Sequence, residues 1–162
     1  MHFDLITQCM FLLVIANGAP ILASRMLGDA FSQPLDCGIT LPDGHPLFGT
    51  SKTFRGIIAA LAATALLAPV IGVSWGTGLI LAALATAGDL VSSFVKRRLG
   101  LTPSCRFTGL DQIPEALVPA MAGIRLLGLS VYDVTFVVAL FFMGAIILSR
   151  IFFKLKIRQH PY

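Results

Sequence analysis

A polar face on one hydrophobic segment is the first place where this sequence could do chemistry. Asp89, Ser92, Ser93 and Lys96 are spaced i, i+3, i+4 and i+7, which places them on one face of a helix. An ionised carboxylate near the end of a membrane span costs about 2–3 kcal/mol. Two interpretations stay open. In the structural interpretation, Lys96 or Arg97 offsets the charge of Asp89, or Asp89 simply reaches the membrane interface. In the functional interpretation, Asp89 binds a hard cation such as Mg²⁺, which prefers carboxylate oxygens and water.

Two further acids stand at the start of a later apolar segment. In TGLDQIPEALVP, Asp111 precedes the segment and Glu115 lies just inside it. Pro114 favours a helix that begins between them, because proline is tolerated in the first turn of a helix. Two carboxylate sites at one membrane edge resemble what a pair of divalent metal ions requires, although an Asp at a helix start is also a common cap.

A loop rich in Gly and Pro, residues 34–56, ends in Lys52, Thr53 and Arg55. It is not a P-loop, because Lys52 comes two residues too late and no strand precedes it. Backbone N–H groups of a Gly-rich turn, together with these three side chains, can nevertheless hold phosphate oxygens at a helix N-terminus. A simple membrane anchor explains the two cations but not the whole Gly-Thr-Ser-Lys-Thr run.

Several other chemistries find no support. The three histidines are scattered and no serine has an evident base beside it, which argues against a Ser-His-Asp hydrolase and a zinc site. The D-G-x2-A-R…G-x3-D-x3-D pattern of alcohol phosphotransferases that use CDP-lipids is also absent. The remaining inventory of carboxylates, cations and small polar residues suits phosphoryl or nucleotidyl transfer to a lipid.

The elements that must position these residues are membrane helices. The chain has 162 residues, of which 56% are hydrophobic and 12% charged, whereas soluble domains carry about 25% charged residues. A chain this short cannot bury so much apolar surface in its own interior. The sequence therefore predicts an all-α integral membrane protein with a single membrane-embedded catalytic domain over residues 1–162. The N-terminal segment lacks a basic region and is interpreted as a first span rather than a signal peptide.

Five segments are apolar enough to be considered as spans, because a crossing needs about 20 mostly apolar residues. One of them, residues 113–129, is shorter and is interrupted by polar residues and proline. For this segment a full span, a tilted span and a re-entrant hairpin all stay open. Two long loops, 25–53 and 96–112, alternate with very short turns. The predicted spans are residues 5–24, 54–72, 76–95, 113–129 (the shorter one) and 132–153.

The distribution of cations predicts the orientation. With five spans, eleven of the twelve Lys and Arg residues fall on one side and only Arg125 lies elsewhere. The positive-inside rule makes that side the cytoplasm. We therefore expect the N-terminus outside, the C-terminus inside and both long loops cytoplasmic. The net charge of +4 follows from this arrangement and needs no nucleic-acid partner; reduced thiols are expected for the three cysteines.

Five blocks of this sequence resemble the CDP-archaeol synthases and their bacterial relatives. They occur in the family's order and cover the first three quarters of the chain. The blocks are ANGAP (16–20), PLDCG (34–38), LFGTSKTFRG (47–56), GDLVSSFVKRRLGL (88–101) and GLDQIPEALVP (109–119). The resemblance implies a five-helix membrane enzyme that uses CTP and Mg²⁺, transfers CMP to a lipid phosphate and releases pyrophosphate. The chain is also distantly similar to bacterial CDP-diacylglycerol synthases.

The resemblance also implies roles for individual residues. Asp89 and Asp111 would be metal ligands, with Glu115 as a helper, and Lys96 would join the two aspartates as a catalytic group. One departure is notable: archaeal enzymes tend to place a second acid two residues after the glutamine of the DQ pair, where this chain has Pro114 followed by Glu115.

The nucleotide and the lipid phosphate would be held by cations and hydrogen-bonding side chains. Asn17 could equally serve helix packing, as polar groups in spans often do. The expected phosphate and nucleotide contacts are Lys52, Thr53, Arg55, Ser93, Lys96, Arg97 and Asn17.

Two other classes of function stay open. A small transporter or channel component would line its pathway with Asp89, Glu115 and Arg125, because ionisable residues inside membranes often mark such pathways. A non-catalytic lipid-binding subunit would share the same polar edge without turning over a nucleotide.

Overall fold

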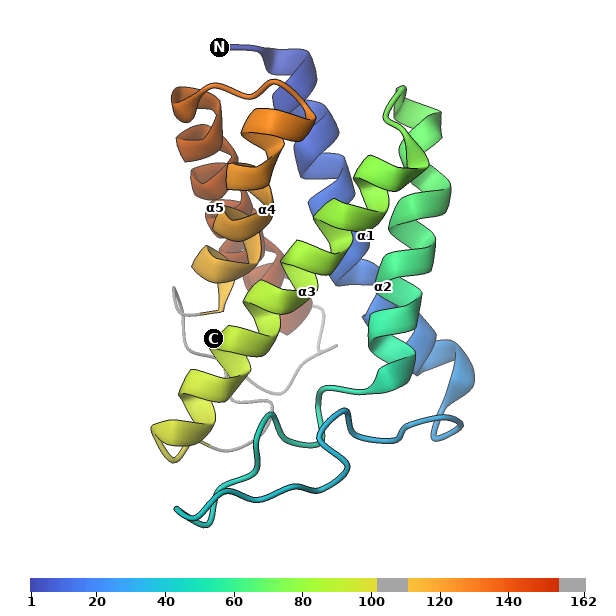
Figure 1. Cartoon of the computed structure of the whole chain (residues 1–162), viewed down its shortest axis with the longest axis vertical. Coiled ribbons are helices and arrows are strands. Elements are labelled where there is room, and N and C mark those ends of the chain that lie inside the picture. Colours follow the sequence, from blue (N-terminus) through green and yellow to red (C-terminus); the bar gives the residue numbers. More distant parts are fainter. Residues whose placement is uncertain (102–110, 155–162) are drawn as a thin grey trace.

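The part of the chain that the structure describes consists mainly of five α-helices, with a long loop between the first and the second. The computed structural model describes residues 1–101 and 111–154. Within that part of the chain the α-helices and one 3₁₀ turn are α1 (Phe3–Leu27), α2 (Phe54–Leu67), η1 (Ala68–Ile71), α3 (Trp75–Arg98), α4 (Gln112–Leu126) and α5 (Val131–Lys154) (Figure 1). Each predicted segment coincides with one helix, or with α2 and η1 together, so the all-α prediction is confirmed.

Three of these helical stretches are long and apolar enough to cross a membrane. They are α1, α2 with η1 (Phe54–Ile71), and α3. The described apolar part of α5 is Val131–Ile147, and α4 has 15 residues. These lengths fit an integral membrane protein, whereas the prediction of five crossings stays a prediction.

Small residues let the helices approach closely in the core. Alanines from α1, α3 and α4 meet valines and Phe141 from α5. In membranes, such small residues at helix interfaces favour close packing through van der Waals contact. The buried members of this core are Ile6, Cys9, Leu13, Ala16, Ala82, Ala85, Ala116, Ala120, Leu129, Val134, Val137 and Phe141.

At Gly88 the backbones of α3 and α4 come close together. A Cβ atom at this position would lie 2.3 Å from the carbonyl oxygen of Pro114 and 2.9 Å from the amide nitrogen of Glu115. Both are backbone atoms, which cannot move aside cheaply. The absence of a side chain at Gly88 therefore fixes the crossing of the two helices, and the neighbouring residue Asp89 comes to lie beside the first turn of α4.

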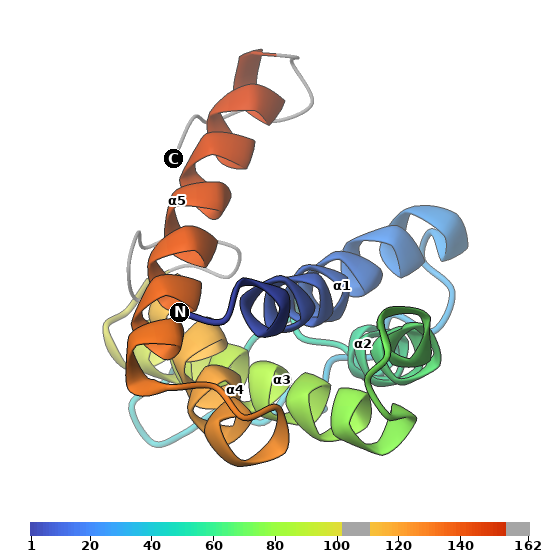
Figure 2. The same ribbon diagram turned by 90° about the horizontal axis from the view of Figure 1, so that it is seen from above.

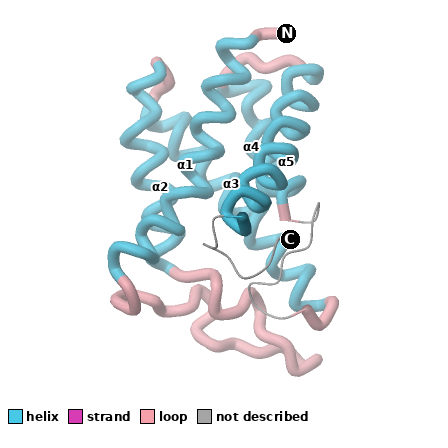
Figure 3. The backbone as a smooth tube through the Cα atoms, turned by 180° about the vertical axis from the view of Figure 1, so that it is seen from behind, coloured by secondary structure: helices cyan, strands magenta, loops and turns pink. Residues whose placement is uncertain are grey.

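The two ends of the bundle differ in character. The N-terminus, the α2–α3 turn and the α4–α5 turn lie at one end, and the long α1–α2 loop lies at the other (Figure 1, Figure 3). The last turns of α1 and α3 bring Arg25 and the Lys96–Arg98 cluster to the loop end, while Arg125 is in the last turn of α4 at the opposite end. The cations whose places are described are thus sorted between the two ends as expected.

A buried carboxylate ties the first residues of the chain to α5. Asp133 has no exposed surface. Its Oδ1 accepts a hydrogen bond from the backbone N–H of His2 at 3.1 Å, and its Oδ2 lies 2.8 Å from His2 Nδ1. The backbone N–H and the hydroxyl of Ser130 also donate to Oδ2, at 2.9 and 2.8 Å. These bonds close the bundle at the end remote from the long loop.

Candidate active site

The α1–α2 loop is closed at its neck by backbone hydrogen bonds. The N–H of Leu35 donates to the carbonyl of Lys52 at 2.7 Å, and the N–H of Phe54 donates to the carbonyl of Gln33 at 3.3 Å. Directly after this neck, Thr53 caps α2, because its Oγ1 accepts from the backbone N–H of Gly56 at 3.2 Å. Such a cap satisfies a donor that the helix itself leaves unpaired. The neck and the cap together fix where Lys52 leaves the backbone.

The tip of the same loop is fastened to the end of α3 by Arg98. Its guanidinium forms an ion pair with Asp43 and donates to the carbonyl oxygens of His45, at 3.2 Å, and Pro46, at 2.7 Å. The guanidinium also lies over the ring of Phe94, 5.2 Å from its centroid. The loop is therefore held at both its neck and its tip.

The partner of Asp89 is Lys52, contributed by the loop. Lys52 Nζ lies 2.5 Å from Asp89 Oδ2, and both side chains are partly exposed. The interpretation from the sequence considered Lys96 and Arg97 for this charge, whereas the ion pair that the structure shows is with Lys52. Lys52 is 37 positions away from Asp89 in the sequence, and the spacing of residues along one helix gives no information about a partner from another element.

Lys96 instead pairs with Asp111. Its Nζ lies 2.7 Å from Asp111 Oδ1, and the two side chains are 10% and 18% exposed. Asp111 occupies the N-cap position of α4 but makes no side-chain cap hydrogen bond. The interpretation of Asp111 as an ordinary helix cap is therefore not supported, and its carboxylate is directed to the α3 cation.

All ten of the predicted site residues line one cavity of about 1020 Å³. They come from four helices and the long loop, and sequence separations of up to 98 positions (17 to 115) are bridged by the fold. The site residues on the cavity wall are Asn17, Lys52, Thr53, Arg55, Asp89, Ser93, Lys96, Arg97, Asp111 and Glu115. Their common location is a fact of the structure, while their individual roles stay predictions.

Ser92 does not share that wall with Asp89, Ser93 and Lys96. It is fully buried, its Oγ donates to the carbonyl of Gly88 at 2.9 Å, and it is not among the residues that line the cavity. The predicted polar face is thus split: Ser92 turns into the helix packing and Ser93 faces the cavity.

Three of the lining residues already have structural partners. Asn17 Nδ2 donates to the carbonyl of Leu13 at 3.0 Å, within its own helix, and Thr53 caps α2. Arg55 donates to the carbonyl oxygens of Gly28, at 2.8 Å, and Ala30, at 2.5 Å. The contacts of Asn17, Thr53 and Arg55 with a nucleotide therefore stay predictions. The bonds of Arg55 to Gly28 and Ala30 also order the start of the loop.

The carboxylates fit a magnesium ion by their chemistry. The part of the chain that the structure describes holds no group of three or more His, Cys, Asp and Glu side chains arranged around one metal position. Mg²⁺, however, is usually held by one or two carboxylates together with water and substrate phosphates. Asp89 and Asp111 line the same cavity, and Glu115 is near enough to interact electrostatically with both, so the donor set suits this ion.

The cavity also has an apolar part. Met10, Val14 and Ile21 of α1 and Phe141 and Ile147 of α5 are among its lining residues. Seen along the bundle, α1 and α5 start close together and then diverge (Figure 2). The cavity therefore has charged and apolar side chains on its walls, and these apolar side chains come from α1 and α5.

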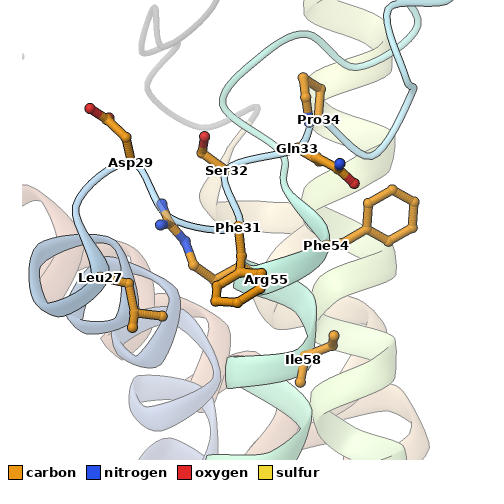
Figure 4. A pocket seen from close by; sticks show the side chains of 9 residues that line it. All are labelled: Leu27, Asp29, Phe31, Ser32, Gln33, Pro34, Phe54, Arg55 and Ile58. Atoms are coloured by element: carbon orange, nitrogen blue, oxygen red, sulfur yellow. The ribbon is translucent and has the colours of Figure 1, made fainter.

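A smaller pocket of about 730 Å³ lies beside the start of the long loop (Figure 4). Of the predicted site residues only Arg55 lines it, and its other walls include the apolar side chains of Leu27, Phe31 and Ile58. Because the paired acids and lysines are elsewhere, the larger cavity is the candidate active site.

Two features of the site region were missed by sequence reasoning. One is Asp36, which is buried inside the long loop; the other is the close approach at Gly88. The Asp36–Gly38 spacing is typical of an Asx turn, in which an Asp side chain accepts from the backbone two residues on, and could have drawn attention to Asp36. No local signal distinguishes Gly88 from the other glycines of α3.

Comparison with known proteins gives consistent results. The family model described as CarS-like CDP-archaeol synthase matches residues 2–162. The CDP-archaeol synthase of Sulfurisphaera tokodaii is 32% identical over 156 residues, covering 92% of this chain and 90% of the relative. That of Pyrobaculum calidifontis is 32% identical over 170 residues, covering 94% and 96%.

A solved structure shares the fold. It is described as an intramembrane enzyme for archaeal membrane lipid biosynthesis, and it is 29% identical to this chain with a TM-score of 0.72. The similarity covers 87% of this chain and 90% of the solved one. The likeness thus extends over nearly all of both molecules.

Proposed function

The chain belongs to the CDP-archaeol synthase family, and from that premise we propose that it transfers CMP from CTP to the phosphate of a membrane lipid, giving a CDP-lipid and pyrophosphate. The family match over residues 2–162 supports the class of reaction. The observation that carries the assignment of the site is the gathering of all ten predicted residues on one cavity whose walls also include apolar side chains.

The reaction requires charge screening more than a base. The nucleophile is an oxygen of the lipid phosphate, which is already anionic at neutral pH. It forms a bond to the α-phosphorus of CTP, while the bond from that phosphorus to the bridging oxygen breaks and pyrophosphate leaves with the electron pair. Two polyanions must approach each other, and positioned cations stabilise the charge that they bring together.

The cations of the cavity are suited to that task. Lys52 enters from the loop, and Lys96 and Arg97 enter from the last turn of α3. Lys96 and Arg97 are 8% and 2% exposed, so their charges act where water screens them little. We assign the triphosphate and the lipid phosphate to these three groups and to Arg55, with Ser93, Thr53 and Asn17 as hydrogen-bonding partners.

A magnesium ion would be held by Asp89 and Asp111, with Glu115 as a further ligand or as a support for the other two. When bound, it would neutralise part of the charge on the phosphates. The two lysines that pair with these aspartates hold the carboxylates in place at the boundary between α3, α4 and the loop.

The apolar part of the cavity offers a place for the lipid chains. A lipid phosphate at Lys52 or Lys96 would extend its hydrocarbon chains between α1 and α5, along Val14, Ile21 and Ile147, which line the cavity. CTP would approach from the loop end. The two substrates would then meet at the lysines, with the loop end facing the cytoplasm, the N-terminus outside and five spans crossing the membrane.

The two other classes of function are less well supported. A transport pathway would require ionisable residues at several depths of one passage, but Arg125 does not line the cavity and lies at the opposite end of the bundle. A non-catalytic lipid-binding subunit needs no nucleotide site, and direct measurement of CTP binding separates it from the enzyme.

The decisive experiment supplies purified protein in detergent with radiolabelled CTP, Mg²⁺ and a panel of lipid phosphates that includes a prenylglycerol phosphate and a phosphatidate. We expect a labelled CDP-lipid from at least one of them, and loss of product when the metal is chelated. Absence of turnover on the whole panel, together with absence of CTP binding, would contradict the proposal.

A further inference from the structure

Asp36 is a buried carboxylate that the proposed reaction does not use. It is 4% exposed, and it is not among the residues that line the large cavity. Its Oδ1 accepts from the backbone N–H of Gly38 at 3.1 Å, and its Oδ2 accepts from those of Phe48 and Gly49 at 3.0 and 2.8 Å. The carboxylate thus joins the first half of the loop, at Gly38, to the second half, at Phe48 and Gly49, from inside.

A short series of hydrogen bonds connects this carboxylate with Lys52. Gly49, which donates to Asp36, accepts at its carbonyl from the N–H of Lys52 at 3.2 Å. The carbonyl of Lys52 in turn accepts from the N–H of Leu35 at 2.7 Å, and Leu35 is the neighbour of Asp36 in the chain. Both peptide groups of Lys52 are therefore held by residues that Asp36 binds or adjoins.

The loop has an unusual backbone around Asp36. Cys37, Gly38 and Gly49 have φ angles of 48°, 81° and 89°, in the left-handed region that side chains other than glycine rarely adopt. Such conformations persist when surrounding bonds fix them. The hydrogen bonds from the N–H groups of Gly38, Phe48 and Gly49 to Asp36 hold these conformations in place.

We propose that Asp36 is a positioning residue for the reaction: it acts through Lys52, holding the backbone from which the Lys52 ammonium reaches Asp89. This inference rests on the proposed function, in which Lys52 holds a phosphate group. An amide at position 36 has only one acceptor oxygen, and its NH₂ group would face N–H donors. Asp36→Asn should thus shift Lys52 without altering the chemical identity of any side chain on the cavity wall.

A double-mutant cycle between Asp36 and Lys52 tests the proposal, with KM for CTP and kcat measured for Asp36→Asn, Lys52→Ala and the double variant. We expect Asp36→Asn to raise KM for CTP about tenfold, the effect of one weakened charge-assisted contact. If Asp36 acts through Lys52, the double variant should lie within about twofold of Lys52→Ala, because coupled residues are not additive.

Asp43 provides a matched control in the same loop. It also accepts from a backbone N–H two residues on, that of His45 at 3.1 Å, but its ion pair is with Arg98 at the loop tip. Asp43→Asn removes the same charge, and its effect on KM should multiply with that of Lys52→Ala. The proposal would be overturned if the effect of Asp36→Asn on KM multiplied with that of Lys52→Ala in the same way as the effect of Asp43→Asn does. An unchanged KM for CTP in Asp36→Asn would overturn it as well.

The outcomes separate this inference from the proposed function. A defective Lys52→Ala variant whose loss multiplies with that of Asp36→Asn overturns only the role of Asp36. A Lys52→Ala variant with unchanged KM and kcat overturns the phosphate-binding role of Lys52 as well. If Asp36→Asn does not yield folded protein, Asp36→Glu, which keeps the charge and displaces the carboxylate by one methylene, takes its place in the cycle with the same expected coupling.

Discussion

At the scale of single residues, the site combines two acid–base pairs that bind different parts of the chain to each other. Lys52 joins the long loop to α3 through Asp89, and Lys96 joins α3 to the start of α4 through Asp111. Neither pair is an isolated surface ion pair, since all four side chains line the cavity. Each of them therefore has both a structural partner and a place at the proposed reaction.

Neutralising Asp89 should abolish most activity without unfolding the protein. Asp89→Asn keeps the size of the side chain, and the partly exposed Lys52 that it leaves can be solvated, so little stability is lost. We expect turnover of CTP to fall about 100-fold or more, comparable to the loss of one strong electrostatic group in other active sites.

The measurement is the rate of CDP-lipid formation, together with thermal unfolding in detergent. Asp29→Asn is the control, because Asp29 is an exposed loop carboxylate that does not line the large cavity. Full activity of Asp89→Asn would show that this carboxylate is not a metal ligand.

Asp36 should make the loop sensitive to acid. Burial by itself raises the pKa of this carboxyl group, but the hydrogen bonds from the N–H groups of Gly49, Phe48 and Gly38 outweigh it and hold the pKa below its ordinary value of 3.8. A lowered pKa in the folded state stabilises the protein above the ordinary value, and this stabilisation is lost as the pH falls through the lowered pKa.

We therefore expect the unfolding temperature in detergent to fall as the pH is lowered below about 4. Asp36→Asn should reduce this dependence, because an amide does not titrate. An identical acid profile in the wild type and the variant would show that Asp36 does not contribute to it. Asp43, whose pKa is also lowered, first by the N–H of His45, adds to the acid dependence that remains.

At the scale of elements, the contact between α3 and α4 determines the geometry of the carboxylates. Asp89 follows Gly88 in α3, and Glu115 follows Pro114 in α4, and the two helices meet at these glycine and proline backbones. The crossing is therefore the structural condition for bringing acids from two helices to one cavity.

Gly88→Ala should destabilise the protein and impair its activity. The added methyl group would meet the carbonyl oxygen of Pro114 at 2.3 Å, and relief requires that one helix move. Overpacking of this kind costs about 1–3 kcal/mol, which lowers the unfolding temperature by several degrees.

Gly76→Ala is the matched control in the same helix, because a Cβ at Gly76 meets nothing within 4 Å. It should be neutral or slightly stabilising, since alanine favours helix more than glycine. An unfolding temperature for Gly88→Ala equal to that of Gly76→Ala would contradict the proposed role of the crossing.

At the scale of the whole molecule, the separation of the two ends suggests how it sits in a membrane. The long loop and the cationic last turns of α1 and α3 are at one end, and short turns are at the other (Figure 1). From the positive-inside rule we expect the cationic end to face the cytoplasm.

Cysteine labelling of intact cells tests this orientation. Cys37 is exposed in the long loop and Cys9 is buried, so a variant in which Cys105 is replaced by serine reports on Cys37. We expect a membrane-impermeant maleimide to label Cys37 only after the cells are permeabilised.

Val131→Cys supplies the opposite reporter, placed in the same Cys105→Ser background with Cys37 also changed to serine. Val131 is 70% exposed at the start of α5, at the end remote from the loop. It should be labelled without permeabilisation. Labelling of Cys37 in intact cells, with protection of the residue at 131, would reverse the proposed orientation.

The sequence by itself determined the helices and selected ten residues that line one cavity. Long apolar runs can only be helices in a membrane, where every backbone group needs an internal partner, and the predicted segments coincide with α1 to α5. Polar residues cluster at span ends because charge is costly deeper in the bilayer. For the same reason the ten predicted residues, drawn from those ends and the motifs beside them, share one cavity.

Only the tertiary structure decided which residues are partners. Spacing along α3 suggested Lys96 for Asp89, but the pairs are Lys52 with Asp89 and Lys96 with Asp111. Helical periodicity shows which residues of α3 share a face, but it does not show which residues of other elements contact that face. The approach of α4 at Gly88 and the closure of the loop around Asp36 bring residues that are far apart in the sequence to the same place, and they decide the pairing.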